Sequence, residues 1–377
     1  MEYLNNNKYF AQVAGSLEKI AAMELEELGA TDIQTTYRGV SFQAEQADLY
    51  RILYQTRICT RILAPLISFQ AHSEKYLYSQ ALQFDWRQLF TIDKTFGIST
   101  NVANSKIDNS LYAGQTLKDA ICDKFREIGG NRPDYDQKEP DVRLNLHINE
   151  NWVNISLDLG GEPLHKRGYR LVGMQATLQE TLAAAIVRVS QWEGERPFCD
   201  PFCGSGTLLE EAMMLYCKIP AGYLRKKWGI IHLPDFSTNR WTLTKYEADQ
   251  QIRDLPPDLI IGSDIMSRNV SITRKNLNVF HQGANVKVNT ADFRNLPEME
   301  NITIVCNPPF GKRLRKEEID ELLQDLGDFF KQKCKNSRAY VLVGGSEFSG
   351  ALRLRSKMNK LLKNGDIDSR LLCLDLY

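Results

Sequence analysis

Two rhythms of apolar and polar residues alternate along the first 70 positions. Short stretches with a period of two are typical of half-buried strands. These stretches are residues 8–13, 33–37, 39–43 and 61–68. Residues 17–28 and 47–57 repeat apolar positions every three or four residues, which predicts two amphipathic helices. The predicted order β-α-β-β-α-β is that of a ferredoxin-like module, which we place at residues 1–60.

Residues 70–160 mix helical and alternating patterns. The patterns predict helices and strands in turn, and the last two strands form a hairpin. The helices are residues 76–84 and 116–128, and the strands are residues 95–101, 143–148 and 152–158. The segment 101–114, with Lys106, Asn109 and Tyr112, is predicted to be a polar loop. It is either a solvated loop, which is favoured because loops are generally polar and exposed, or a loop that faces RNA phosphates.

After residue 160, apolar strands alternate with amphipathic helices. The strands end at Asp200, Asp264, Asp292, Cys306 and Val343, and the helices cover residues 179–192, 208–216, 267–280 and 318–333. The tail is predicted to be an antiparallel hairpin of residues 356–362 and 370–376. This alternation predicts a doubly wound, Rossmann-like α/β domain over residues 160–377. The fold class is therefore α/β, preceded by an α+β region.

A glycine-rich turn follows the first of these strands, in the sequence DPFCGSGT. Gly204 and Gly206 let a ligand approach the backbone closely and permit a positive φ. The helix that follows presents free N–H groups at its N-terminus, which suit a carboxylate or phosphate. Asp200 lies at the carboxyl end of the strand, where ligands of open α/β sheets bind. A tight turn without a ligand is the alternative interpretation.

Acidic residues end the next two strands. An acid at the end of the second strand accepts hydrogen bonds from ribose hydroxyls in related folds. Asp264 follows Asp200 by 64 residues, however, which is far more than the usual interval of about 20. The excess is residues 221–250, which we predict to be an insertion on the ligand face or a second crossover helix. Asp292 and Phe293 end the third strand, where an acid and an aromatic ring can hold an adenine.

The fourth strand leads directly into Asn307-Pro308-Pro309-Phe310. Prolines fix φ and lack N–H groups, so the carbonyl groups of this loop can face outward as acceptors. With the Asn307 side chain they can accept both hydrogens of an exocyclic amine, while Phe310 stacks on the base that carries it. Such an acceptor pair favours the positive charge that develops on the nitrogen as it attacks a methyl group. The alternative is a proline-rich turn.

A basic cluster precedes the glycine turn, in the sequence GGEPLHKRGYR. It contains Lys166, Arg167 and Arg170 with Tyr169 among them. Such a patch can bind backbone phosphate and stack a base, so these four residues are candidates for RNA binding. A solvated hinge between two domains is the equal alternative.

Composition limits the class of protein. The chain has no net charge, so contact with nucleic acid requires local basic patches. Eight cysteines lie scattered in apolar runs without zinc-ligand spacing, so we expect reduced thiols, no disulfide framework and no metal. The first residues lack a signal-peptide pattern, and no apolar run is long enough to cross a membrane. We therefore expect a cytoplasmic protein.

DPFCGSGT followed by NPPFGKR resembles the S-adenosylmethionine-dependent amino methyltransferases. With HKRGYR and the WG-containing insertion, the chain is similar to the THUMP-domain RNA guanine-N2 methyltransferases, and most of all to those of the bacterial large ribosomal subunit. The resemblance implies a THUMP RNA-binding domain at residues 44–159, which overlaps the first module. It also implies a cofactor site for the methionine end, the ribose and the adenine. Its residues are Asp200, Pro201, Cys203, Gly204, Ser205, Gly206 and Thr207 for the methionine end, Asp264 and Ile265 for the ribose, and Asp292 and Phe293 for the adenine.

The resemblance further implies that Asn307, Pro308, Pro309 and Phe310 grip the target base. Phe310 replaces the tyrosine that is common in the family, which keeps the stacking but loses the hydroxyl. The predicted activity is methyl transfer to guanine N2 in structured RNA, with 23S rRNA favoured over tRNA. Alternatives are adenine-N6 methylation of DNA, glutamine methylation of a protein, and an RNA-binding chaperone without activity.

Overall fold

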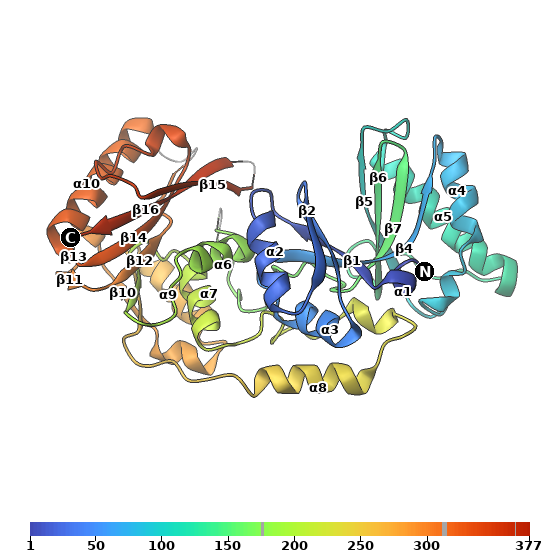
Figure 1. Cartoon of the computed structure of the whole chain (residues 1–377), viewed down its shortest axis with the longest axis horizontal. Coiled ribbons are helices and arrows are strands. Elements are labelled where there is room, and N and C mark those ends of the chain that lie inside the picture. The colour runs from blue at the N-terminus through green and yellow to red at the C-terminus, as the bar shows by residue number, and fades with distance from the viewer. Residues whose placement is uncertain (175–176, 311–314, 366) are drawn as a thin grey trace.

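The computed structural model describes residues 1–174, 177–310, 315–365 and 367–377 of the chain. It contains two seven-stranded sheets and one two-stranded sheet. The N-terminal half and the C-terminal half each build one of the large sheets, at opposite ends of an elongated molecule (Figure 1). No helix in the described part of the chain is long and apolar enough to cross a membrane.

The first sheet has the order β2-β3-β1-β4-β7-β6-β5. Its strands are β1 (Lys8–Val13), β2 (Thr31–Thr36), β3 (Gly39–Gln43), β4 (Cys59–Gln70), β5 (Phe96–Ala103), β6 (Val142–Asn149) and β7 (Trp152–Asp158). Its helices are α1 (Tyr3–Asn6), α2 (Glu18–Glu27), α3 (Gln46–Gln55), α4 (Glu74–Gln83) and α5 (Ser110–Gly129), with a short 3-10 helix at Trp86–Gln88. β4 pairs antiparallel with β1 on one edge and with β7 on the other. The ferredoxin-like module and the segment that follows it therefore share one continuous sheet.

The prediction of a polar loop over residues 101–114 is wrong for most of that segment. β5 continues to Ala103, and α5 begins at Ser110 rather than at residue 116. Asn109 explains the earlier start, because its side chain accepts a hydrogen bond from the backbone N–H of Tyr112 at 3.0 Å and caps the helix. The cap lies in a polar stretch without apolar periodicity, so the pattern missed the first turn.

The second sheet has the order β10-β9-β8-β12-β14-β16-β15. Its strands are β8 (Phe198–Asp200), β9 (Ile260–Asp264), β10 (Lys287–Thr290), β12 (Thr303–Cys306), β14 (Ser337–Val343), β15 (Met358–Asn364) and β16 (Ile367–Leu376). The helices of this half are α6 (Glu180–Val189), α7 (Thr207–Tyr216), α8 (Thr238–Asp249), α9 (Ser267–Leu277) and α10 (Lys316–Lys333). Short 3-10 helices lie at Gly229–His232, His281–Asn285, Phe293–Asn295 and Ser346–Phe348, and β11 (Met299–Glu300) pairs with β13 (Cys334–Lys335).

β8 lies between β9 and β12, and all three strands are parallel. From β8 the strand order runs toward β10 on one side and toward β14 on the other. β8 is therefore next to the topological switch point, where open α/β sheets bind ligands beyond the carboxyl ends of their strands. The tail forms the predicted antiparallel hairpin, with β16 paired to β14 and β15.

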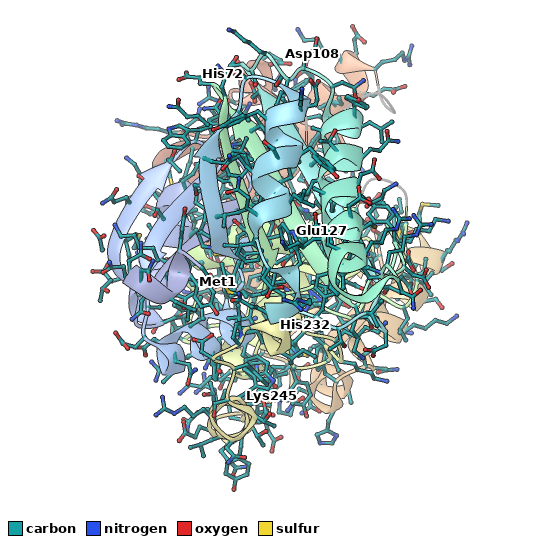
Figure 2. The ribbon with its side chains drawn as sticks, turned by 90° about the vertical axis from the view of Figure 1, so that its right-hand side faces the viewer. Met1, His72, Asp108, Glu127, His232 and Lys245 are labelled. Carbon is teal, nitrogen blue, oxygen red and sulfur yellow. The ribbon has the colours of Figure 1, made fainter. Side chains whose placement is uncertain are left out.

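The insertion at residues 221–250 packs on the N-terminal half rather than on the ligand face, so the first of its two predicted alternatives is wrong. The second alternative agrees with the structure, because α8 is a second helix between β8 and β9. Helix α8 packs against α3 of the N-terminal half, and Lys245 marks this helix below the first sheet in Figure 2. Tyrosine hydroxyls of the N-terminal half donate hydrogen bonds to the insertion, from Tyr3 to Asp235 at 2.7 Å and from Tyr54 to Asp249 at 2.8 Å. The aromatic rings of Tyr50, Tyr54, Trp228 and Trp241 pack between the two parts. The insertion thus fastens one half of the chain to the other.

Candidate active site

A cavity of about 1030 Å³ opens at the carboxyl ends of β8, β9, β10 and β12. It brings together the strand-end residues Asp200, Asp264, Asp292 and Asn307, which are far apart in the sequence. All the residues predicted for the cofactor line this cavity except Gly206, and so do all four predicted for the target base. The glycine turn and the Asn-Pro-Pro-Phe strand end therefore face one space.

The glycine turn holds a backbone shape that side chains would prevent. Gly204 and Gly206 have φ values of 56° and 91°. A Cβ on Gly206 would come within 2.8 Å of the Thr273 side chain, whose hydroxyl donates a hydrogen bond to the Gly204 carbonyl at 2.8 Å. Gly206 is the N-cap of α7 and offers no capping side chain. The first N–H groups of α7 are therefore left for another acceptor.

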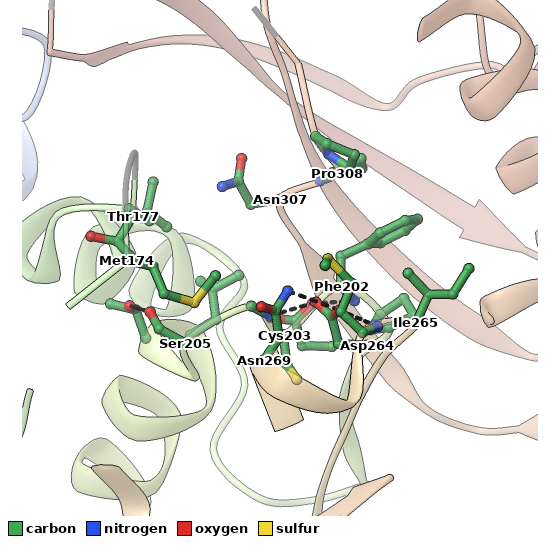
Figure 3. Close-up of a pocket in the computed structure, with 18 of the residues that line it drawn as sticks. Met174, Thr177, Phe202, Cys203, Ser205, Asp264, Ile265, Asn269, Asn307 and Pro308 are labelled. Carbon is green, nitrogen blue, oxygen red and sulfur yellow. Dashed lines mark hydrogen bonds between the residues drawn. The ribbon is translucent and has the colours of Figure 1, made fainter. Parts of the chain in front are cut away.

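Asp264 connects the glycine turn to the end of β9. Its Oδ2 accepts a hydrogen bond from the Gly204 N–H at 3.0 Å. Its Oδ1 accepts two more, from the Met266 N–H at 2.9 Å and the Asn269 side chain at 3.0 Å (Figure 3). A carboxylate has about four acceptor positions, so one position on Oδ2 remains for a ligand hydroxyl.

Asp200 is 1% exposed at the end of β8. Burial raises its pKa to about 8, and the negative charge of Asp264 acts in the same direction, while a hydrogen bond from the Phe202 N–H opposes both. Burial therefore favours the protonated carboxyl group in the free protein. A ligand cation beside it would favour the ionised form.

Asp292 and Phe293 form another part of the wall. The Asp292 carboxylate is about one-fifth exposed and forms a salt bridge with Arg294 at 3.0 Å. Phe293 is almost fully buried between Phe202 and Phe329, with ring centroids 5.0 Å and 5.7 Å away. The ring therefore lines the cavity as a fixed surface.

Asn307 carries an unsatisfied acceptor. Its Oδ1 is buried and accepts no hydrogen bond from the described residues. Such an orphaned polar atom is costly unless a ligand binds to it. Figure 3 shows Asn307 and Pro308 across the cavity from Met174 and Thr177. Residues 311–313, which complete the NPPFGKR motif of the resemblance, lie outside the described residues.

The basic cluster is not a surface patch, so its interpretation as an RNA contact is wrong for Arg167 and Tyr169. These side chains are 2% and 1% exposed, and both donate hydrogen bonds to the buried carboxylate of Glu211, at 3.4 Å and 3.0 Å. Arg170 also points inward and pairs with Glu180 at 2.9 Å. Lys166 alone of the four is largely exposed. Arg167 and Arg170 point inward because they pair with carboxylates on α7 and α6. The sequence around the two arginines does not show that these carboxylates lie beside them.

Sequence reasoning missed several residues that line the cavity. They come from the segment before α6, from the start of α9, and from the end of β15 and the start of β16. These residues are Gly173, Met174, Thr177, Leu178, Met266, Arg268, Asn269, Asn364 and Ile367. None belongs to the motifs that end β8, β9, β10 and β12, so no signal in the sequence pointed to them; Asn269 takes part through its hydrogen bond to Asp264.

The second sheet, its helices and this cavity form a Rossmann-like α/β domain, and comparison with known families identifies it as a methyltransferase domain. Residues 167–372 match the family described as "RMKL-like, methyltransferase domain". Residues 71–158 match the THUMP domain, and residues 8–63 match the RlmL ferredoxin-like domain. The chain therefore belongs to the RMKL-like methyltransferases that carry these two N-terminal domains, which confirms the predicted fold class.

Named relatives cover almost the whole chain. It is 34% identical over 369 residues to "Ribosomal RNA large subunit methyltransferase K/L" of Photobacterium profundum, covering 96% of this chain but only 52% of that protein. It is also 34% identical over 373 residues to "Putative RNA methyltransferase slr0064" of Synechocystis, covering 98% and 97% of the two chains. A crystal structure of "a putative methyltransferase complexed with SAH" superposes with a TM-score of 0.88 at 25% identity and covers 99% of this chain and 98% of that one.

Proposed function

We propose that this chain transfers a methyl group from S-adenosylmethionine to the exocyclic N2 amine of a guanine in structured RNA, with 23S rRNA as the favoured substrate. The observation that carries the proposal is the buried Oδ1 of Asn307, which has no hydrogen-bond partner among the described residues and belongs to a residue that lines the same cavity as the glycine turn. An acceptor in that place calls for an N–H donor, and an aryl amine supplies one.

The described residues fit the cofactor. S-adenosylmethionine has an ammonium group, a carboxylate, a ribose and an adenine. Asp200 suits the ammonium, the open N-terminus of α7 suits the carboxylate, and the free position on Asp264 suits a ribose hydroxyl. Asp292 and Phe293 are left for the adenine. When bound, the cofactor supplies a methyl group on a positively charged sulfur.

Asn307 and the carbonyl group of Pro308 would hold the two hydrogens of the target amine. This arrangement aims the nitrogen lone pair at the methyl group and favours the positive charge that develops on the nitrogen. The amine then loses one proton to solvent. Phe310 would stack on the base, which has to leave its helix to enter the cavity. No general base is needed before the attack, because the lone pair itself makes the new bond.

The N-terminal half would hold the RNA, which its THUMP domain and the names of the relatives support. The chain spans about half the length of the K/L relative, so the substrate of that longer protein comes to this chain only as part of the proposal. The same amine chemistry serves a guanine in tRNA or an adenine in DNA. The assay therefore has to include these acceptors.

The test is methyl transfer from tritiated S-adenosylmethionine to four acceptors: 23S rRNA, ribosomal large subunits, tRNA and duplex DNA. The ribosomal RNA comes from a strain that lacks the gene, so that the target nucleotide is unmodified. Digestion to nucleosides and mass spectrometry identify the product. We expect N2-methylguanosine in 23S rRNA. N6-methyladenosine as the product, or transfer only to tRNA or DNA, would contradict the proposed specificity.

A further inference from the structure

Arg170 lies behind the wall of the cavity rather than in it. Its Nε donates to Glu180 at 2.9 Å, and its two terminal nitrogens donate to the Leu178 carbonyl at 3.2 Å, the Ser205 hydroxyl at 3.3 Å and the Thr207 hydroxyl at 3.2 Å. Leu178, Ser205 and Thr207 all line the cavity, but Arg170 does not. One guanidinium group thus joins the segment before α6 to the glycine turn.

The hydrogen bonds of Arg170 set the direction of both hydroxyl groups. Arginine has only donors, so the oxygens of Ser205 and Thr207 must accept from it. Each hydroxyl then keeps its own hydrogen to donate. The two oxygens lie 3.5 Å apart, so at most one hydrogen is used between them. At least one hydroxyl therefore remains a donor at the wall of the cavity.

The charges around Arg170 favour an anion at the same wall. Glu180 pairs with the guanidinium directly. Glu210, in the first turn of α7, is fully buried, and its carboxyl group accepts no hydrogen bond from the described residues. Burial raises the pKa of this carboxyl group, and the positive charge of Arg170 opposes that shift. The N-terminus of α7 adds partial positive charge and unpaired N–H groups. The wall made by Ser205 and Thr207 is thus a surface of hydrogen-bond donors beside a cation.

We infer that Arg170 is the positioning residue for the carboxylate of the cofactor's amino-acid end. It makes the hydroxyl groups of Ser205 and Thr207 donors toward that carboxylate. It also holds the segment that contains Leu178 at a fixed distance from the glycine turn. This inference rests on the proposed function, because it takes S-adenosylmethionine as the ligand. It assigns Arg170 a role inside the enzyme in place of the predicted contact with RNA.

Calorimetry on the full chain with two ligands tests the inference. S-adenosylhomocysteine contains the amino-acid end, whereas 5′-methylthioadenosine keeps the adenosine and the thioether but lacks that end. Arg170→Met should lower the affinity for S-adenosylhomocysteine at least tenfold and change the affinity for 5′-methylthioadenosine less than twofold. Arg170→Lys keeps the charge and the donors but loses the planar fork, so the loss should be about threefold. Arg188→Met is the matched control, since Arg188 of α6 pairs with Glu27 of α2 and is not among the residues that line the cavity. Its affinities should match those of the wild type.

The outcomes separate the possibilities. An equal loss of affinity for both ligands would show that Arg170 only maintains the fold. Unchanged binding of S-adenosylhomocysteine would show that the hydroxyl groups of Ser205 and Thr207 bind the carboxylate without help from Arg170. Either result overturns the inference while the proposed function stands. Wild-type protein that binds neither ligand overturns the proposed function as well. If circular dichroism shows that Arg170→Met is unfolded, Arg170→Lys decides, because it must weaken S-adenosylhomocysteine more than 5′-methylthioadenosine.

Discussion

Replacing Asn307 by alanine should abolish most of the methyl transfer without weakening the free protein. The side chain has one buried acceptor, Oδ1, that no described residue satisfies. An ordinary buried amide stabilises the fold through its hydrogen bonds, so its removal is costly. Removing the Asn307 side chain is expected not to lower the stability of the free protein, because the hydrogen-bond donor to its Oδ1 is present only when the substrate is bound.

The magnitudes follow from that difference. Removing one preorganised hydrogen-bonding group that acts in the transition state lowers a rate by about 10²–10³-fold. Leaving a buried acceptor unsatisfied costs about 1–3 kcal/mol, and Asn307→Ala removes that cost while losing a few packing contacts of a half-buried side chain. We therefore expect the free energy of unfolding to stay constant or to rise by about 1 kcal/mol. For a domain of this size such a rise corresponds to roughly 2–4 °C in the melting temperature.

Asn276 provides the matched contrast. Asn276 is 1% exposed, and both polar atoms of its amide form hydrogen bonds: Nδ2 donates to the Ser205 carbonyl at 3.1 Å, and Oδ1 accepts from the Leu171 and Val172 N–H groups at 3.1 Å and 3.2 Å. Asn276→Ala should therefore destabilise the protein by about 1–3 kcal/mol. The two alanine variants remove the same amide group, but Asn276→Ala should lower the melting temperature, whereas Asn307→Ala should leave it unchanged or raise it.

The assay combines single-turnover methyl transfer, calorimetry with S-adenosylhomocysteine and thermal melting followed by circular dichroism. Asn307→Ala should bind the cofactor product with an affinity near that of the wild type. Transfer within about threefold of the wild-type rate would refute the role of the amide as the acceptor for the target amine. A clear loss of S-adenosylhomocysteine binding would instead assign Asn307 to the cofactor.

Three further predictions concern the buried charges and the glycine turn. Burial raises the pKa of Asp200 to about 8 from 3.8, so its protonated form favours the folded protein and that contribution is lost as pH rises to about 8. Binding of a ligand ammonium needs the ionised form, so the affinity for S-adenosylhomocysteine, measured by calorimetry from pH 6 to 8, should rise by up to about tenfold per pH unit, and Asp200→Asn should make it constant. Glu211→Ala leaves the Arg167 guanidinium buried without its carboxylate, so urea denaturation should show a loss of about 3–5 kcal/mol; a loss below about 1 kcal/mol would contradict the burial of the pair. Gly206→Ala forces a side chain against Thr273 at a φ of 91°, so calorimetry should detect little binding of S-adenosylhomocysteine, and binding near the wild-type level would contradict a rigid turn.

Most of the elements could be predicted from local patterns, because apolar periodicity depends on which face of each element is buried. The errors have local causes. Asn109 begins α5 through a side-chain cap in a polar stretch, and the insertion at residues 221–250 packs on α3 through aromatic residues that no spacing rule places. The continuity of the first sheet through β4 was also outside the reach of local patterns, because both of its partners are distant in the sequence.

The sequence by itself determined the two motifs that face the cavity. A positive φ favours glycine, and two prolines after a strand leave carbonyl groups without competing N–H groups. The local conformation of DPFCGSGT and NPPF can therefore be predicted from the residue types alone. Only the tertiary structure decided that Arg167, Tyr169 and Arg170 point inward. Their partners are Glu211 and Glu180, on helices α7 and α6. Whether a cation meets solvent or a carboxylate depends on how those helices pack, and the residues around the cation do not encode it.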